Sequence, residues 1–538
     1  MKRARLRGAT AGLVGLALVA AACGSGSGGG SATNATVDPG IKSGVAAALG
    51  GGTATTGGSA TTTTVAEPTT IEGWEALWKQ QRDAIVKRIT DNKWGKAADG
   101  KSLTGPGGWT VDLSKCPGNW SDTEGLTDTS MKVGLSLAQS GNYAEYNNYS
   151  RAMRVLFDYY GAQGAFKDVN GKTRKIDFIT KDDGYDAARA IPNVDELLDS
   201  EKVFAVWTLG SPSTLKTYDK INQRCVPHPE AITAHAAWGD PVNHPWTTGA
   251  PNLSYSSEAI LWGSFLEQHL SEFPADRKVK VAALVVNNDF GKLYDGSFRA
   301  YVAQTPALKD RIDYSTENIE AATPTVTDPM TTLAAKNPDV FIAMVAATPC
   351  TQAVTEAAQN GMHEKVKYLF QPITCAGTTF VKKEKVGGDG SAANNWWIVD
   401  TGAKDLTGSR FQSDPYVQWV RNLLQGAGID VNSSSLFTGG VILSWTFVQS
   451  AIIAGQLPGG LTRTNFILAQ RSLDMTSSMF ESGIHFHMDG AKDAYFIEAG
   501  QYQQWDSAKQ TWVPKSDVVD LDGKSKNCAW DAAASVCK

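Results

Sequence analysis

The sequence predicts an α/β protein of two similar lobes, each with a central, mostly parallel sheet flanked by helices. Short apolar segments alternate with helix-patterned segments over most of the chain, and strands in such an alternation are joined by right-handed crossovers into a parallel sheet. The alternation stops at a loop rich in Pro, Trp and Asn, residues 236–255, and then resumes. A chain of 538 residues is also too long for one core, so two domains with tails are expected.

The first series of strands and helices precedes this loop. Its helix at 147–164 has apolar residues at helical spacing and ends at Gly161 and Gly164, which are typical helix stops. The expected strands are 131–138, 174–183, 202–210 and 225–231, and the expected helices are 147–164, 186–200 and 212–224.

The second series follows the loop with the same order of elements. The expected strands are 278–288, 311–319, 338–347 and 366–372, and the expected helices are 256–270, 291–304, 329–337 and 350–361. Further helices are expected at 414–428 and 439–457, and the stretch 483–514 reads as strands joined by turns.

The N-terminus has the pattern of an export signal. The basic segment "MKRARLRG" precedes "LVGLALVAAAC", an apolar run too short to span a membrane comfortably. The pattern resembles a bacterial lipoprotein signal, in which Cys23 is diacylated and anchors the protein to the membrane; an ordinary secretory signal is the alternative. Residues 24–70 are Gly, Ser, Ala and Thr with few large apolar residues, which predicts a disordered linker.

Six further cysteines in an exported chain indicate disulfides, with 15 connectivities open. Spacing favours Cys528–Cys537 and Cys350–Cys375, which leaves Cys116–Cys225. The absence of a CxxC sequence argues against a redox motif or a zinc ribbon.

The sequence argues against several chemistries. The net charge is −5, and no Lys/Arg run follows the extreme N-terminus, so no nucleic-acid partner is expected. There is no GxGxxG, GxxxxGK[ST] or GxSxG motif in the folded part, so we expect no nucleotide cofactor, no catalytic residues and no enzyme activity. His485, His487 and Asp489 would share one face of a strand, but a solvated face is the favoured interpretation and no metal is expected.

Ser211, Ser213 and Thr214 follow a strand and open a helix. Hydroxyls and free N–H groups at a helix N-terminus can hold a carboxylate, and simple N-capping is the alternative. A serine nucleophile would need a histidine base, and the sequence offers no obvious one.

The order and spacing of "VGLSLAQSGNYAEY", the segment 181–214, "CVPHPEA" and "VAALVVNNDFGKLYDGSFRAYV" resemble the periplasmic binding proteins of the Leu/Ile/Val-binding type. The resemblance covers roughly 131–512. It implies the type I periplasmic binding fold, with three segments crossing between the lobes and a ligand in the cleft. The implied crossings lie near 252–255, 400–404 and 477–483.

The resemblance also implies ligand contacts. Tyr146 and Phe290 match cleft aromatics, and Ser211 and Ser213 match the loop that holds a ligand carboxylate. The full set of expected ligand-binding residues, with Trp207 added because it ends a strand, is Tyr146, Trp207, Ser211, Ser213, Ala231, Thr233, Phe290, Gln371 and Thr374. The loop of Gln371 and Thr374 lacks the acid that amino-acid binders of the family carry, so an amino-acid-like compound, an amide and a carboxylate all stay open as ligands.

Together these observations predict a membrane-anchored, extracytoplasmic and monomeric binding protein that delivers a small molecule to an ABC permease. A ligand-sensing receptor module and, less favoured, an exported hydrolase using Ser211 or the histidine pair are the alternatives. The expected divisions are a signal peptide 1–23, a linker 24–70, a helical extension 71–124, lobe 1 at 125–253 with 401–476, lobe 2 at 254–400 with 477–520, and a disulfide-bonded tail 521–538.

Overall fold

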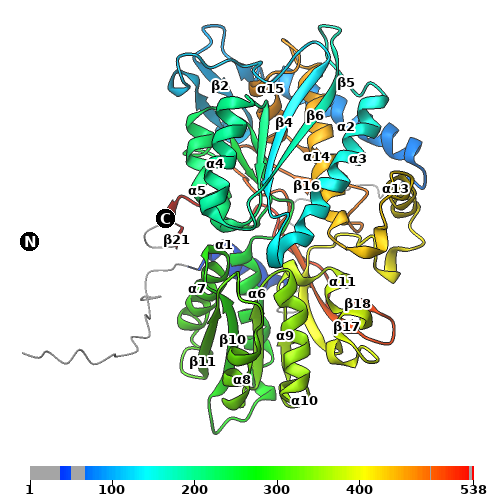
Figure 1. The fold of residues 1–538 in the computed structure, drawn as a ribbon. Helices are drawn as coiled ribbons and strands as arrows, with labels where there is room; N and C mark the ends of the chain where they lie inside the picture. Colours follow the sequence, from blue (N-terminus) through cyan, green and yellow to red (C-terminus); the bar gives the residue numbers. More distant parts are fainter. Residues whose placement is uncertain (1–36, 50–66, 485, 532–535, 538) are drawn as a thin grey trace, which may run out of the picture.

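The computed structural model describes residues 37–49, 67–484, 486–531 and 536–537. Figure 1 shows two α/β lobes, one above the other, each with helices packed around a central sheet. The two-lobe α/β architecture predicted from the alternating pattern is confirmed. The expected signal peptide and its Cys23 lie outside the described residues.

Lobe 1 is built on a sheet with the strand order β5-β6-β4-β7. Strands β4 (Ser130–Leu137), β6 (Thr173–Asp182) and β7 (Ala205–Thr208) run parallel, and the short β5 (Phe166–Lys167) is antiparallel. A bridge between Leu209 and Ile232 continues the sheet to the parallel pair β8 (His228–Ala231) and β9 (Thr247–Gly249). The intervening helices are α3 (Asn147–Ala162), α4 (Ala187–Asp195) and α5 (Ser211–Gln223).

Lobe 2 has the strand order β11-β10-β12-β13-β14-β17-β18. The first five strands are parallel, whereas β17 and β18 are antiparallel to their neighbours. These strands are β10 (Val279–Val286), β11 (Ile312–Ile319), β12 (Val340–Met344), β13 (Tyr368–Phe370), β14 (Trp396–Asp400), β17 (Ala499–Asp506) and β18 (Thr511–Pro514). The helices between them are α6 (Tyr255–Gln268), α7 (Asp289–Gln304), α8 (Thr327–Ala335) and α9 (Thr348–Gln359).

The chain passes between the lobes three times. It leaves lobe 1 after β9, returns after β14 to form α13 (Pro415–Gly426), α14 (Phe437–Gln456) and α15 (Arg463–Gln470), and enters lobe 2 again before β17. Among the described residues, α14 is the one helix long and apolar enough to cross a membrane. It is almost entirely buried, against α3 and α15, and therefore serves as the core helix of lobe 1.

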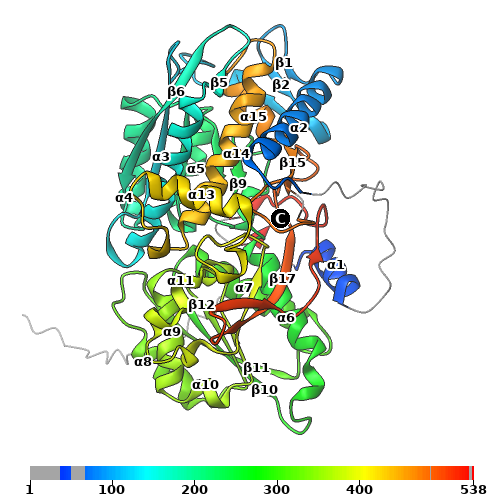
Figure 2. The ribbon, with the colours of Figure 1, turned by 90° about the vertical axis from the view of Figure 1, so that its right-hand side faces the viewer.

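The N-terminal extension is an addition to lobe 1. Its helix α2 (Ile71–Asp91) buries Trp74 and Trp78 and lies beside α14, as Figure 2 shows. The Trp78 indole Nε1 donates to Thr476 O over 2.8 Å, so one end of this apolar ring is hydrogen-bonded. The Cys116–Cys225 disulfide ties the connector after α2 to the end of α5.

Part of the expected linker 24–70 is folded, which corrects that prediction. Residues 39–49 form the helix α1 (Pro39–Leu49), which contacts α6 in lobe 2. Val37, Ile41 and Val45 are buried, at a spacing of four residues, and so make one apolar stripe. The averaged Gly, Ser and Ala composition of the region concealed these three side chains.

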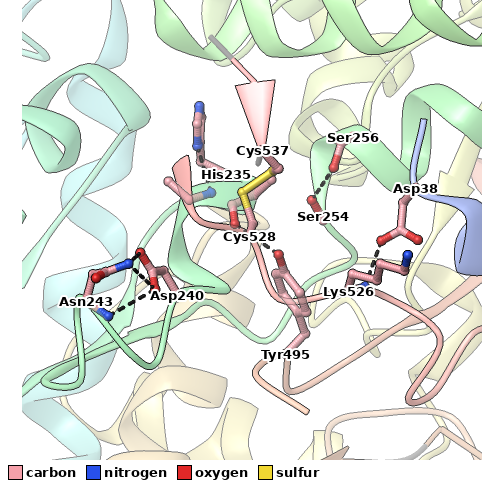
Figure 3. The surroundings of a disulfide bond; sticks show 12 residues. Asp38, His235, Asp240, Asn243, Ser254, Ser256, Tyr495, Lys526, Cys528 and Cys537 are labelled. Carbon is pink, nitrogen blue, oxygen red and sulfur yellow. Dashed lines mark hydrogen bonds between the residues drawn. A yellow bond between two sulfur atoms is a disulfide. The ribbon is translucent and has the colours of Figure 1, made fainter. Parts of the chain in front are cut away.

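All three predicted cysteine pairs are disulfides in the structure: Cys116–Cys225, Cys350–Cys375 and Cys528–Cys537. The C-terminal one lies where the tail meets both lobes, as Figure 3 shows. Cys528 N donates to Gly239 O in lobe 1, and Lys526 N donates to the Asp38 carboxylate just before α1. The tail therefore joins the N-terminal helix on lobe 2 to a loop of lobe 1.

Candidate functional site

A cavity of about 170 Å³ lies between the two lobes. Loops that follow the carboxyl ends of strands contribute to its lining: Gly210 lies two residues after β7, Thr233 two after β8, Ala346 two after β12, and Thr374 four after β13. Ligand sites of parallel α/β sheets lie at these carboxyl ends. Both lobes thus contribute their usual binding edge to one space.

Aromatic side chains form much of the cavity wall. Tyr146, Tyr149 and Tyr185 belong to lobe 1, and Tyr255 and Phe290 belong to lobe 2. Ring centroids are 5.9 Å apart for Tyr146 and Tyr149, and 5.1 Å apart for Tyr255 and Phe290. Burial raises the pKa of all four tyrosines, so their phenols are neutral at physiological pH.

Two predicted hydroxyl residues line the cavity. The Thr233 hydroxyl forms a 2.7 Å hydrogen bond with the Ser211 hydroxyl, and the Thr374 hydroxyl donates to Val345 O over 3.0 Å. The Cys350–Cys375 disulfide links α9 to the loop that carries Thr374, so this part of the wall is covalently braced.

Of the nine ligand-binding residues expected from the sequence, the structure brings four together at the cavity: Tyr146, Thr233, Phe290 and Thr374. The other five do not line it. Trp207 is fully buried in the core of lobe 1, with its ring centroid 4.9 Å from that of Phe447.

The remaining four residues also have structural partners. Ser211 is fully buried behind Thr233, and the Ser213 carbonyl accepts a hydrogen bond from Thr217 one turn further along α5. Ala231 packs with Tyr218 and Trp238, and the Gln371 amide donates to Cys350 O over 2.7 Å. Each of these positions follows or ends a strand, but its side chain points into a lobe rather than toward the cavity.

The sequence did not identify the charged residues of the site. Asp400, Asp405 and Arg410 line the cavity from the second crossing segment, and Gln503 reaches it from β17. The Asp405 carboxylate accepts from Thr378 N and Thr407 N over 2.9 and 2.8 Å. Arg410 forms an ion pair with Glu481. An acid next to Trp396–Val399, a buried apolar strand, was the signal that would have drawn attention to Asp400.

The lobes touch one another at the rim of the cavity. Asn142, in the turn before α3, donates to Thr323 O over 2.9 Å, and its own carbonyl accepts from the Thr348 hydroxyl at the start of α9. These contacts link lobe 1 to two loops of lobe 2. The structure therefore has the two lobes closed against each other.

His487, one of the two histidines considered for a metal, lies away from the cavity. His487 Nδ1 is 3.6 Å from Asp493 Oδ2, and a hydrogen bond to Asp493 raises the pKa of His487. His487, Asp493 and Asp522 offer ligand atoms within 4.8 Å of one another. His485 lies outside the described residues. None of the three described residues lines the cavity between the lobes.

A family model described as a periplasmic binding protein matches residues 130–414. These residues include all of lobe 1 up to β9, the parallel part of lobe 2 and the second crossing. Among curated proteins, none matches the chain.

Solved structures with this fold are numerous. A branched-chain amino-acid ABC transporter protein from Thermus thermophilus with bound valine has a TM-score of 0.60 at 15% identity, over 73% of this chain and 97% of that one. A fatty-acid ABC transporter substrate-binding protein from Thermomonospora curvata has a TM-score of 0.59 at 16% identity, over 76% of this chain and 97% of that one. A solute-binding protein from R. palustris in complex with benzoate has a TM-score of 0.56 at 15% identity, over 74% of this chain and 99% of that one. At these identities the likeness shows the fold.

Beneath the cavity lies Glu258, a fully buried carboxyl group on α6. It hydrogen-bonds the Tyr294 hydroxyl over 2.5 Å and accepts from Ile373 N over 2.8 Å. Burial raises the pKa of Glu258 to about 8, and the nearby Asp400 adds to the shift. The native protein therefore holds a proton here that the unfolded chain releases at a lower pH.

We expect the free energy of unfolding to fall as pH rises from about 4.5 to 8, because the native state binds the extra proton in this window. One such proton corresponds to about 1.4 kcal/mol per pH unit. Glu258→Gln does not titrate; its amide oxygen keeps the bond from Ile373 N, and its NH2 donates to the Tyr294 hydroxyl oxygen. The unfolding free energy of the variant should therefore fall less steeply with pH, by up to this amount. Urea unfolding between pH 5 and 8 measures the slopes. The exposed Glu384→Gln is the control, and equal slopes for wild type and Glu258→Gln would contradict the assignment.

Proposed function

Because the chain belongs to the periplasmic binding protein family and has its type I fold, we propose that it is the extracytoplasmic solute-binding protein of an ABC importer. A small organic solute binds in the cavity between the lobes, against Tyr146, Thr233, Phe290 and Thr374. The observation that carries the proposal is that carboxyl-end loops of both lobes meet at one cavity with aromatic walls. The bound form then docks on a membrane permease.

The mechanism is binding without turnover. Solute contacts both lobes only when they are closed, so it stabilises the closed state by its differential affinity for that state. The Asn142 contacts across the rim support a closed state with direct lobe–lobe hydrogen bonds. Ser211, which a hydrolase would use, is buried with its hydroxyl bonded to Thr233, and this supports binding rather than catalysis.

We also propose that the protein is a lipoprotein held at the cell membrane through lipid on Cys23. The basic segment and short apolar run before Cys23 support an export signal. Two acyl chains supply about 0.8 kcal/mol per buried CH2, which is enough for stable anchoring of a soluble body.

A solute that binds in the cavity should make the protein more compact. A thermal-shift panel of amines, amino acids, amides and small carboxylates first identifies binders, and small-angle scattering then compares the radius of gyration with and without them. We expect a smaller radius with the binder, because closure brings the lobes together. Binding without any compaction, or no binder in a broad panel, would count against a transport role.

Phe290→Ala should weaken binding of such a solute about 10-fold or more, because it removes a buried aromatic wall of the cavity. Trp207→Phe is the matched control: its ring lies in the lobe 1 core, so it should lower stability by about 1 to 3 kcal/mol and leave affinity unchanged. Calorimetric titration and urea unfolding measure the two effects. Weaker binding by Trp207→Phe together with unchanged binding by Phe290→Ala would place the solute against Trp207 instead.

Cys23→Ser should move the protein from the membrane fraction to the soluble extracytoplasmic fraction, because it removes the acylated thiol. Immunoblots of fractions from a bacterial host measure the shift, and mass spectrometry of the wild-type N-terminal peptide checks for acyl chains. Unchanged membrane association of the variant would exclude anchoring through this residue.

A further inference from the structure

We propose that the solute carries a positively charged nitrogen and that Asp400 recognises it. This inference rests on the proposed solute-binding function. The solute class is thus an organic amine or ammonium compound rather than a carboxylate. Four features of the cavity support this: an acid without a counter-ion, an arginine already paired, a helix N-terminus covered by a ring, and neutral aromatic walls.

Asp400 is a buried acid without a counter-ion. It ends β14, is 9% exposed and lines the cavity. Its Oδ2 accepts from the Gln503 amide over 2.9 Å. Within the described part of the chain, no Lys, Arg or His nitrogen forms an ion pair with it at 4.0 Å or less. A buried carboxylate without a cation is costly, and an ammonium group in the cavity supplies the missing charge.

The charged groups around Asp400 favour a cation further. The charge of Arg410 acts on Asp400 and favours its ionised form, but Arg410 is itself paired with Glu481. Glu481 faces Asp400 from the third crossing, and Glu258 faces it from α6. Burial first, and then Glu481, raise the pKa of Asp400 to about 7. The surroundings are therefore rich in carboxyl groups and hold one guanidinium that is already engaged.

The place where an anion would bind is closed. The N–H groups at the start of α5 are the natural carboxylate site of lobe 1. Tyr185 lies over this turn so closely that a Cβ on Gly210 would be 2.5 Å from its ring. The Ser211 hydroxyl beneath is bonded to Thr233. A carboxylate in the cavity thus does not reach the N-terminus of α5, and the Arg410 guanidinium that lines the cavity is already paired with Glu481.

The aromatic walls suit a cation as well. Tyr146, Tyr149, Tyr185 and Tyr255 are neutral phenols whose π faces are electron-rich. A cation over such a face gains about 0.5 to 2 kcal/mol, the larger value when it is desolvated. Asp400 and the rings act on the same charge, so an amine attached to an apolar body uses both the carboxylate and the aromatic surface.

The competing interpretation is that Asp400 stays protonated and donates a hydrogen bond to a neutral or anionic solute. The two interpretations differ in which member of a shape-matched set binds best. Benzylamine, benzyl alcohol and benzoate form one set, and isopentylamine, isopentanol and isovalerate form another. Calorimetric titration at pH 7.5 should give the amine of at least one set an affinity about 10- to 100-fold above its alcohol and carboxylate, the range of a charge-assisted hydrogen bond.

Asp400→Asn tests the residue itself. It should remove most of the amine's advantage, by about 10- to 100-fold, and change alcohol binding by less than about 3-fold. Glu258→Gln is the matched control, since it removes a neighbouring buried acid that does not line the cavity, and it should keep the amine ranked first. An Asp400→Asn variant that retains the full preference for the amine overturns the assignment.

A wild-type measurement covers the case in which Asp400→Asn does not fold. Titration of the preferred compound at pH 7 in two buffers of different ionisation heat counts protons exchanged on binding. Recognition of a cation by ionised Asp400 should release protons, and recognition of an anion should take them up. A preferred carboxylate or alcohol, or proton uptake, overturns this inference while the binding function stands. Failure of the whole panel to bind or compact the protein removes both.

Discussion

The site depends on one constraint: parallel strands joined by right-handed crossovers all end at the same edge of their sheet. Both lobes obey it, and the crossings place the two edges face to face. Loops that follow strands therefore contribute to the cavity wall, such as those of Thr233 after β8 and Thr374 after β13. The position of the cavity between the lobes follows from this arrangement of two facing edges.

The same constraint explains what the sequence could predict. The alternation of strands and helices predicted the elements of both lobes, and the family resemblance predicted Tyr146, Thr233, Phe290 and Thr374, which line the cavity. The sequence pattern could not show which way a side chain points in a strand that is buried on both faces. All residues of β7 are buried, so Trp207 offered no alternation to show that its ring enters the lobe 1 core. Ala231 ends β8, whose residues are likewise all buried, and Gln371 is buried directly after β13. Ser211 and Ser213 are buried in the first turn of α5.

The unpredicted residues belong to segments whose partners are far away in the sequence. Asp400 reaches Gln503 across the antiparallel pair of β14 and β17, which are separated by about a hundred residues. No local pattern gives that register, because the chain visits lobe 1 in between. The helix α1 was also missed. Three apolar residues bury it against lobe 2, but the Gly-rich sequence around them lowers the average hydrophobicity of the region.

The position of Asp400 links the charge of the solute to the movement of the lobes. Asp400 is the last residue of β14, where the chain leaves lobe 2, and its partner Gln503 is on β17, where the chain has just returned. Ala403, three residues further along, pairs with Phe480 on the third crossing. Two of the crossing segments therefore lie side by side next to this carboxyl group. If the solute is a cation, as we propose, it acts on Asp400 beside two of the crossing segments, and its recognition is then coupled to closure of the lobes.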